Sequence, residues 1–174
     1  MQEEALKNGE VFFSDLSLRL KTEGIKHLPE GGGHLPVCFG GNEICAVLLN
    51  GGLTIKKGAA ENAEVGALLR RVRGIATEVL EYATLMQNAP PLIVSSLSVP
   101  YRLLAEFNCI VLGGMRTEFG TQFVTWARRG DGLLFGHYCD NNYGAAKQDF
   151  VIRAGLVEKE CVFSDNHLEP SVTA

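Results

Sequence analysis

The sequence lacks the cysteine and histidine patterns of metal and redox sites. Its cysteines form no Cys-x-x-Cys pair, and its histidines form no His-x-His or His-x3-His spacing that would suit zinc. An odd number of cysteines without framework spacing is typical of a reducing compartment. We therefore expect no bound metal and a cytoplasmic location. The five cysteines are Cys38, Cys45, Cys109, Cys139 and Cys161.

The chain also lacks an excess of positive charge, a long apolar run and a phosphate-binding loop. It has 16 basic and 20 acidic residues, a net charge of −4, which argues mildly against a broad nucleic-acid-binding face. No apolar run approaches the ~20 residues that span a bilayer, and the acidic, polar N-terminus predicts neither a signal peptide nor a membrane anchor. The glycines at 31–33 lie between prolines, and no Gly-Lys-Ser/Thr occurs. We therefore expect no nucleotide-binding loop and no cofactor.

What is present is the composition of an ordinary globular protein. The 174 residues are 46% hydrophobic and 21% charged, and a chain of this length can form a stable core without disulfides. Strand-like and helix-like runs occur in both halves. We expect an α+β fold in which antiparallel β-meanders pack against one long central helix and a C-terminal helix. An N-terminal lobe (1–91) and a C-terminal lobe (92–174) would share one core.

In the first half, residues 1–11 are predicted to be a loose leader before a helix over 14–23. Ser14 would cap this helix, Asp15 would suit its positive N-terminal end, and Gly24 would end it. Residues 27–36 are predicted to be a loop, because prolines and glycines dominate them. Three short strands over 36–56, separated by Gly- and Asn-rich turns, predict a small antiparallel meander. Apolar residues at three- and four-residue steps then predict the long helix over 62–87.

In the second half, four strand-like runs cover 101–107, 109–115, 121–128 and 133–139. Asn108 and the Arg129-Gly-Asp-Gly segment are predicted turns. An alternative is a short helix over 99–107 with Pro100 in its first turn. The last helix would begin after Asn141 or Asn142 and end at Gly155 in a Schellman arrangement. A further helix is predicted to begin at 164–165.

The candidate functional residues lie on the last two strands. Trp126, Arg128, Arg129, His137 and Tyr138 form a possible interaction surface. Because adjacent strand residues point to opposite faces, only one of His137 and Tyr138 can join any one pocket.

Three chemical hypotheses use these or neighbouring residues. A carboxylate that meets His137 would suit general acid–base chemistry, and Asp140 is the nearby acid, provided that the strand bends. A cysteine nucleophile would need His27, His34 or His137 as its base, but no known local signature surrounds any cysteine. Exposed aromatic rings beside Arg128 and Arg129 would suit stacking of single-stranded nucleic acid. Those rings are Phe123, Trp126, Phe135 and Tyr138.

The second half also carries a family resemblance. Its residues are Tyr101-Arg-Leu-Leu-Ala-Glu-Phe-Asn, Val111-Leu-Gly-Gly, Gln122-Phe-Val-Thr-Trp, Gly136-His-Tyr and Tyr143-x-x-Ala-Lys-x-Asp-Phe-x-x-Arg-x-Gly-Leu. Together they resemble a domain of uncharacterised bacterial proteins encoded on integrative conjugative elements. The resemblance implies a cytoplasmic accessory protein of a mobile element, with this unit as one module of a longer chain. It implies a role for no residue.

Three functions remain open from the sequence. The first is a non-enzymatic interaction module that docks a protein partner. The second is a module that binds single-stranded nucleic acid through the aromatic strand face. The third is an enzyme of unrecognised type with His137 in its cleft.

Overall fold

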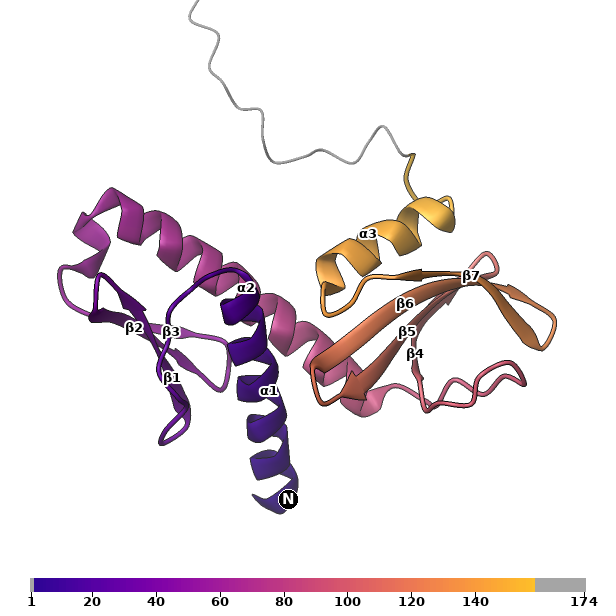
Figure 1. Cartoon of the computed structure of the whole chain (residues 1–174), viewed down its shortest axis with the longest axis horizontal. Helices are drawn as coiled ribbons and strands as arrows, with labels where there is room; N and C mark the ends of the chain where they lie inside the picture. Colours follow the sequence, from indigo (N-terminus) through magenta and orange to yellow (C-terminus); the bar gives the residue numbers. More distant parts are fainter. Residues whose placement is uncertain (1, 159–174) are drawn as a thin grey trace, which may run out of the picture.

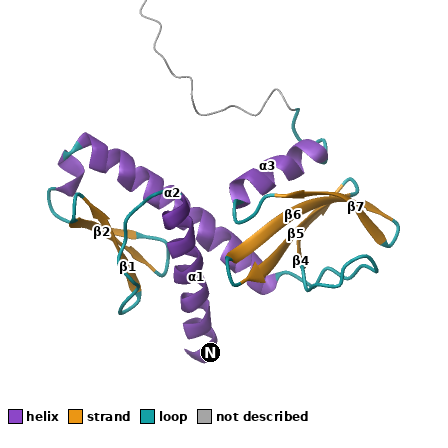
Figure 2. Ribbon diagram, viewed as in Figure 1, coloured by secondary structure: helices purple, strands orange, loops and turns teal. Residues whose placement is uncertain are grey.

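The computed structural model describes residues 2–158, with side chains from residue 9 onward, and it has an α+β fold with two antiparallel sheets (Figures 1 and 2). The smaller sheet has strand order β1-β2-β3 and the larger has order β4-β5-β6-β7. None of the described helices has the length and apolar composition needed to cross a bilayer. The main elements are α1 (Gln2–Thr22), β1 (His34–Phe39), β2 (Asn42–Leu48), β3 (Leu53–Ile55), α2 (Ala63–Asn88), β4 (Arg102–Phe107), β5 (Ile110–Thr117), β6 (Gly120–Arg129), β7 (Gly132–Tyr138) and α3 (Tyr143–Arg153).

Helix α1 is longer than predicted. It begins at Gln2, so the loose leader over 1–11 is wrong for the described residues, and Ser14 is not a cap. Glutamate, alanine, leucine and lysine dominate this stretch, and all four have high helix propensity. The predicted end is confirmed, because Gly24 has φ 69°. The helix buries Phe13, Leu16 and Leu20 in the core.

The small sheet is a meander, as predicted, but its first strand begins within the predicted loop, at His34. Pro36 therefore lies inside β1, which is an edge strand. The carbonyl of Pro36 accepts a hydrogen bond from the amide of Leu28 at 2.9 Å, on the side away from β2. The missing proline N–H lies on that same outward side, so no bond to β2 is lost.

Helix α2 confirms the long-helix prediction. The side chain of Asn62 caps it by accepting hydrogen bonds from the amides of Glu64 at 2.8 Å and Val65 at 3.3 Å. Pro90 and Pro91 follow its end, where proline cannot continue a helix. In Figure 1, α2 runs from the small sheet to the large one, and α1 crosses it between them. One buried apolar cluster accordingly includes side chains from both predicted lobes.

The large sheet confirms the four predicted strands, and the alternative helix over 99–107 is wrong. Asn108 and Cys109 have φ 50° and 63°, the conformation of a two-residue hairpin turn between β4 and β5. The pairing of β4 with β5 shifts by one residue between Leu103 and Ala105, so side chains along β4 do not alternate strictly between the two sheet faces. Phe107, at the end of β4, is 51% exposed.

Helix α3 covers one face of the large sheet (Figure 1). Asn142 caps it by accepting a hydrogen bond from the amide of Ala145 at 2.9 Å. The Schellman end is confirmed, because Gly155 has φ 71° and the amide of Leu156 donates to the carbonyl of Val151 at 2.9 Å. The helix predicted from Ser164 lies outside the described residues.

The connector 89–101 covers the opposite face of the large sheet. A second buried apolar cluster lies between this connector and the strands. Gly113 makes room for it, since a Cβ there would lie 2.6 Å from the Trp126 ring. The cluster consists of Leu92, Val94, Tyr101, Val111, Val124, Trp126 and Leu133.

A buried polar group joins α1 to the large sheet. Asp15, only 1% exposed, forms an ion pair with Arg116 at 3.0 Å and accepts a hydrogen bond from the Thr121 hydroxyl at 2.7 Å. The prediction that Asp15 stands at a helix N-terminus is wrong, because the helix extends upstream and turns this carboxylate inward. The group fixes how the N-terminal helix sits against β5 and β6.

Candidate interaction site on strand β7

Strand β7 is an edge strand whose apolar side chains are mostly in solvent. Leu133 is buried, whereas Leu134 is exposed, Tyr138 is 64% exposed and Phe135 is 76% exposed. We call Leu134, Phe135 and Tyr138 the β7 patch. Leu134 pairs with Ala127 beside the main cluster, whereas Tyr138 pairs with Val124 of the connector-side cluster, so the patch follows the edge of the sheet and not one face of it. Large exposed apolar side chains along one edge suggest an interaction surface.

Phe135 has an unusual backbone conformation. Its φ is 53°, in the left-handed region, at the point where the register between β6 and β7 shifts. Two contacts hold it there. The Nη2 of Arg153 donates to the Phe135 carbonyl at 2.9 Å, and Gly136 lies so close to the indole that a Cβ would be 2.8 Å from Trp126 Nε1. The fold therefore positions an exposed phenyl ring at an irregularity built by buried groups.

The free edge of β7 is partly blocked by the connector. Ser96 Oγ accepts a hydrogen bond from the amide of Leu133 at 3.1 Å, and Ser95 Oγ donates to the carbonyl of Asp131 at 3.0 Å. The irregularity at Phe135 interrupts the row of backbone groups further along. Both features hinder addition of a further strand, so we expect contacts at this edge to be made by side chains.

Two of the predicted surface aromatics are buried. Trp126 is 4% exposed and packs edge-on against Tyr101, with ring centroids 4.9 Å apart. Phe123 lies in the main core. The expectation that Trp126 belongs to an exposed surface is therefore wrong, because the connector covers that face of the sheet. Of the four predicted stacking rings, Phe135 and Tyr138 remain accessible.

The two predicted arginines differ in their surroundings. The Nε of Arg128 forms an ion pair with Glu106 at 2.8 Å, so its charge is already neutralised. Arg129 is exposed at the end of β6 and has no ion-pair partner in the described part of the chain. Of these two arginines, Arg129 is thus the one available to an outside group.

His137 meets a carboxylate, but a different one from that predicted. Its Nδ1 lies 3.0 Å from Asp149 on α3, not near Asp140. Asp149 also accepts a hydrogen bond from Thr125, and its Oδ2 lies 3.8 Å from Arg153. Tyr138 pairs with Val124 of the connector-side cluster, which confirms that His137 and Tyr138 point to opposite faces.

The His137–Asp149 contact gives a pH-dependent contribution to stability. Burial alone would raise the pKa of Asp149, but hydrogen bonds from Thr125 and His137 and the charges of His137 and Arg153 together lower this pKa below 3.8. The folded state therefore holds the charged form more strongly than the unfolded chain does. This stabilisation is complete above the unfolded pKa and is lost as the pH falls through the folded one.

We expect the free energy of unfolding to fall more steeply in the wild type than in Asp149→Asn when the pH is lowered from about 5 to about 3. Urea unfolding at several pH values measures this difference. Parallel curves would show that Asp149 has the same pKa in the folded and unfolded states.

Two of the described thiols are poor nucleophiles. Burial raises the pKa of Cys139, with Asp149 and Asp140 adding to the rise, and burial raises that of Cys45 to about 11.

His27 serves the fold, since its Nε2 lies 2.7 Å from Ser17 Oγ and its Nδ1 lies 3.2 Å from the Ile25 carbonyl. Within residues 9–158, no three histidine, cysteine or acidic side chains gather as metal ligands.

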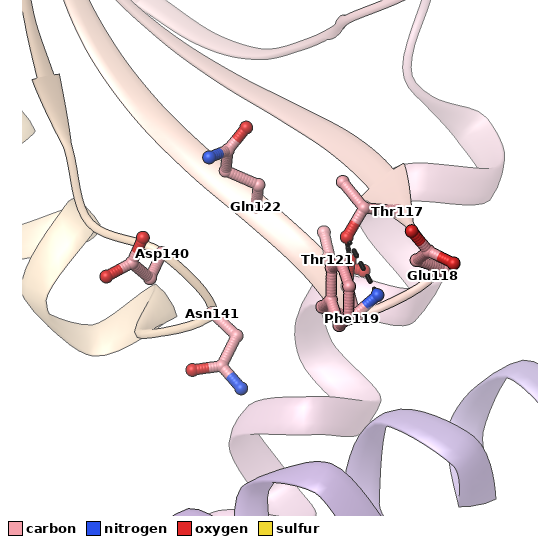
Figure 3. Close-up of a pocket in the computed structure, with 8 residues that line it drawn as sticks. Thr117, Glu118, Phe119, Thr121, Gln122, Asp140 and Asn141 are labelled. Carbon is pink, nitrogen blue, oxygen red and sulfur yellow. Dashed lines mark hydrogen bonds between the residues drawn. The ribbon is translucent and has the colours of Figure 1, made fainter.

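A pocket of about 670 Å³ lies where β7 ends (Figure 3). Figure 3 shows Asp140 and Asn141 on one side of it, across from Thr117 and Phe119. Asp140 has φ 48°, a second positive value close to β7. The pocket has two acidic side chains, Glu118 and Asp140, and no basic one in its lining, so it favours a positively charged group. Its lining residues are Thr117, Glu118, Phe119, Gly120, Thr121, Gln122, Asp140 and Asn141.

Sequence reasoning missed Asp149, Arg153, Gly136 and this pocket. Gly136 carried a usable signal, because a glycine inside a strand pattern suggests a bulge. Comparison of the chain with family models, with curated proteins and with solved structures gives no match. The geometry of this site is therefore the basis for its functional assignment.

Proposed function

We propose that this protein is a non-enzymatic interaction module that docks a protein partner through the β7 patch. The observation that carries the proposal is the exposed ring of Phe135, held on a left-handed backbone. A role in maintenance or transfer of a bacterial mobile element remains a prediction from the family resemblance.

The backbone conformation of Phe135 has an energetic cost. A non-glycine residue in the left-handed region costs about 1–2 kcal/mol, which glycine avoids. The phenyl ring gives little back to the fold, because it is 76% exposed. Strain of this kind at an exposed residue points to a contact outside the chain. Aromatic residues are also common anchors of protein interfaces.

The acid–base alternative finds less support in the surroundings of His137. An imidazole oriented by a carboxylate can act as a general base. His137, however, is exposed and does not line the pocket at the end of β7. The thiol nearest to it in sequence, Cys139, has a raised pKa and is a poor nucleophile. We therefore assign the His137–Asp149 contact to holding α3 on the sheet.

Nucleic-acid binding keeps one supporting observation, the exposure of the Phe135 and Tyr138 rings on β7 and of Arg129 at the end of β6. Asp131 and Asp140 flank the same strand and would repel phosphates. Retention on single-stranded DNA at low salt, lost when salt is added, would favour this alternative over a protein partner.

The test compares Phe135→Gly with Phe107→Gly, which removes an exposed aromatic ring from the opposite edge strand. We expect Phe135→Gly to keep the fold, with a free energy of unfolding unchanged or raised by up to about 1 kcal/mol, because strain is relieved. Affinity capture from the native host should lose its specific partner with Phe135→Gly and keep it with Phe107→Gly.

Two results would contradict the proposal. One is capture of the same proteins by both variants at wild-type levels. The other is a large loss of stability in Phe135→Gly, which would give the ring a role in the fold. Circular dichroism and chemical unfolding of both variants separate loss of binding from loss of folding.

A further inference from the structure

We infer that the pocket at the end of β7 binds a small aliphatic diamine or polyamine, a ligand with ammonium groups at both ends of a hydrocarbon chain. This is the pocket of about 670 Å³ in Figure 3. It is separate from the β7 patch, because none of Leu134, Phe135 and Tyr138 lines it. Its ligand is thus independent of the proposed protein partner.

Hydrogen bonds fix the two sides of the pocket. On one side, the hydroxyl of Thr117 accepts a hydrogen bond from the amide of Phe119 at 3.1 Å and donates to the carbonyl of Gly120 at 2.8 Å. On the other side, the carbonyl of Asp140 accepts a hydrogen bond from the amide of Phe123 on β6 at 2.8 Å. The pocket is therefore formed before a ligand enters, which lowers the entropic cost of binding.

Two carboxylates of the lining have no counter-charge. Glu118 in the β5–β6 hairpin and Asp140 before α3 lie on opposite sides of the pocket (Figure 3), and neither forms an ion pair within the described part of the chain. A hollow lined by charges of one sign concentrates ligands of the opposite sign. Negative groups on opposite sides suit a ligand with a positive group at each end.

A third carboxylate lies behind the pocket. Asp15 is 1% exposed, and a Cβ on the lining residue Gly120 would lie 3.9 Å from its Oδ1. The Nη1 of Arg116 lies 3.0 Å from this oxygen, but no group of the described chain makes a hydrogen bond to it. Arg19, one turn further along α1, is paired with Glu78 at 3.6 Å. A buried acceptor without a hydrogen bond is costly, so an ammonium group on the Gly120 side of the pocket is favoured.

The rest of the lining favours an organic cation over a metal ion. The ring of Phe119 is 76% exposed on the pocket wall, where it can contact both a hydrocarbon chain and an ammonium group. The side-chain amide of Asn141 supplies a neutral acceptor. A metal ion needs several ligands around one point, and over the described residues no three histidine, cysteine or acidic side chains gather in that way.

Titration calorimetry of the full chain with putrescine, spermidine and butylamine tests the inference. We expect putrescine and spermidine to bind with a Kd on the order of 100 µM, because ligands of so few atoms bind weakly. Butylamine has one ammonium group and should bind about tenfold more weakly or worse. Added salt should weaken binding of the diamine. Amide shifts in NMR spectra should centre on residues 117–122 and 140–141.

Matched variants locate the site. Asp140→Asn suits the left-handed backbone at this position and should weaken putrescine binding by about fivefold or more, as should Glu118→Gln. Asp131→Asn removes the same charge from the turn before β7 and should leave the affinity unchanged. Phe135→Gly, outside the pocket, should also leave it unchanged. Wild-type unfolding curves for each variant show that a lost signal is lost binding.

Absence of binding up to about 10 mM putrescine and spermidine, about one hundred times the expected Kd, would overturn the inference. So would equal affinity for putrescine and butylamine, or equal weakening by Asp140→Asn and Asp131→Asn. Displacement of putrescine by an equal concentration of Mg²⁺ would assign the pocket to an inorganic cation instead. Capture of a protein through Phe135 by a chain that binds no amine would end this inference and leave the proposed function standing.

Discussion

Replacing Trp126 with alanine is expected to lower the free energy of unfolding by about 4 kcal/mol. The indole is 4% exposed, packs against Tyr101, and fills the space that Gly113 and Gly136 leave open. Its removal leaves a cavity between the connector and the sheet that neighbouring groups can fill only in part. Chemical unfolding followed by circular dichroism measures the loss.

The matched control is Phe135→Ala, which removes another large aromatic side chain from the same hairpin. We expect it to change the free energy of unfolding by less than about 1 kcal/mol, because exposed side chains contribute little. If Trp126→Ala lowered the free energy of unfolding by less than about 1 kcal/mol, this would contradict the burial of Trp126 and indicate an exposed side chain.

Asp15→Ala is expected to cost about 3 kcal/mol of stability. The substitution leaves the Thr121 hydroxyl buried without its acceptor and removes the carboxylate that pairs with Arg116 at 3.0 Å. Arg116 is partly exposed, so its guanidinium group can be solvated once the carboxylate is removed. Loss of the ion pair therefore adds little to the cost in stability. Thermal and urea unfolding both report the effect.

A double-mutant cycle separates the hydrogen bond from the charge. Thr121→Val removes the hydroxyl at nearly constant shape, so Asp15→Ala should cost less in that background than in the wild type. Equal costs in both backgrounds would show that Asp15 and Thr121 do not interact. A cost for Asp15→Ala near zero would contradict the buried position of this carboxylate.

The parts of the fold that local sequence determines could be predicted from the sequence. Helix α2 begins after the capping residue Asn62 and ends before Pro90, which has no amide donor. Helix α3 begins after the capping residue Asn142 and ends before Gly155. The β4–β5 turn was readable from Asn108 for the same reason. Such signals act within a few residues, so no knowledge of the rest of the chain is needed.

The parts that depend on distant contacts could not be predicted. Trp126 lies in a strand whose residue pattern suggests one face in solvent. Its burial depends on the connector, which covers that face. His137 meets Asp149 only because α3 folds back across the sheet. The left-handed backbone of Phe135 depends on the register between β6 and β7 and on Arg153, which no local pattern specifies.

The most direct test of an interaction role for β7 is photo-cross-linking in cells that naturally produce this chain. Benzoylphenylalanine is placed at position 135, and separately at position 107 on the opposite edge strand. We predict a discrete cross-linked protein product from position 135 that position 107 does not give. No product at position 135, or the same products from both positions, would contradict the account.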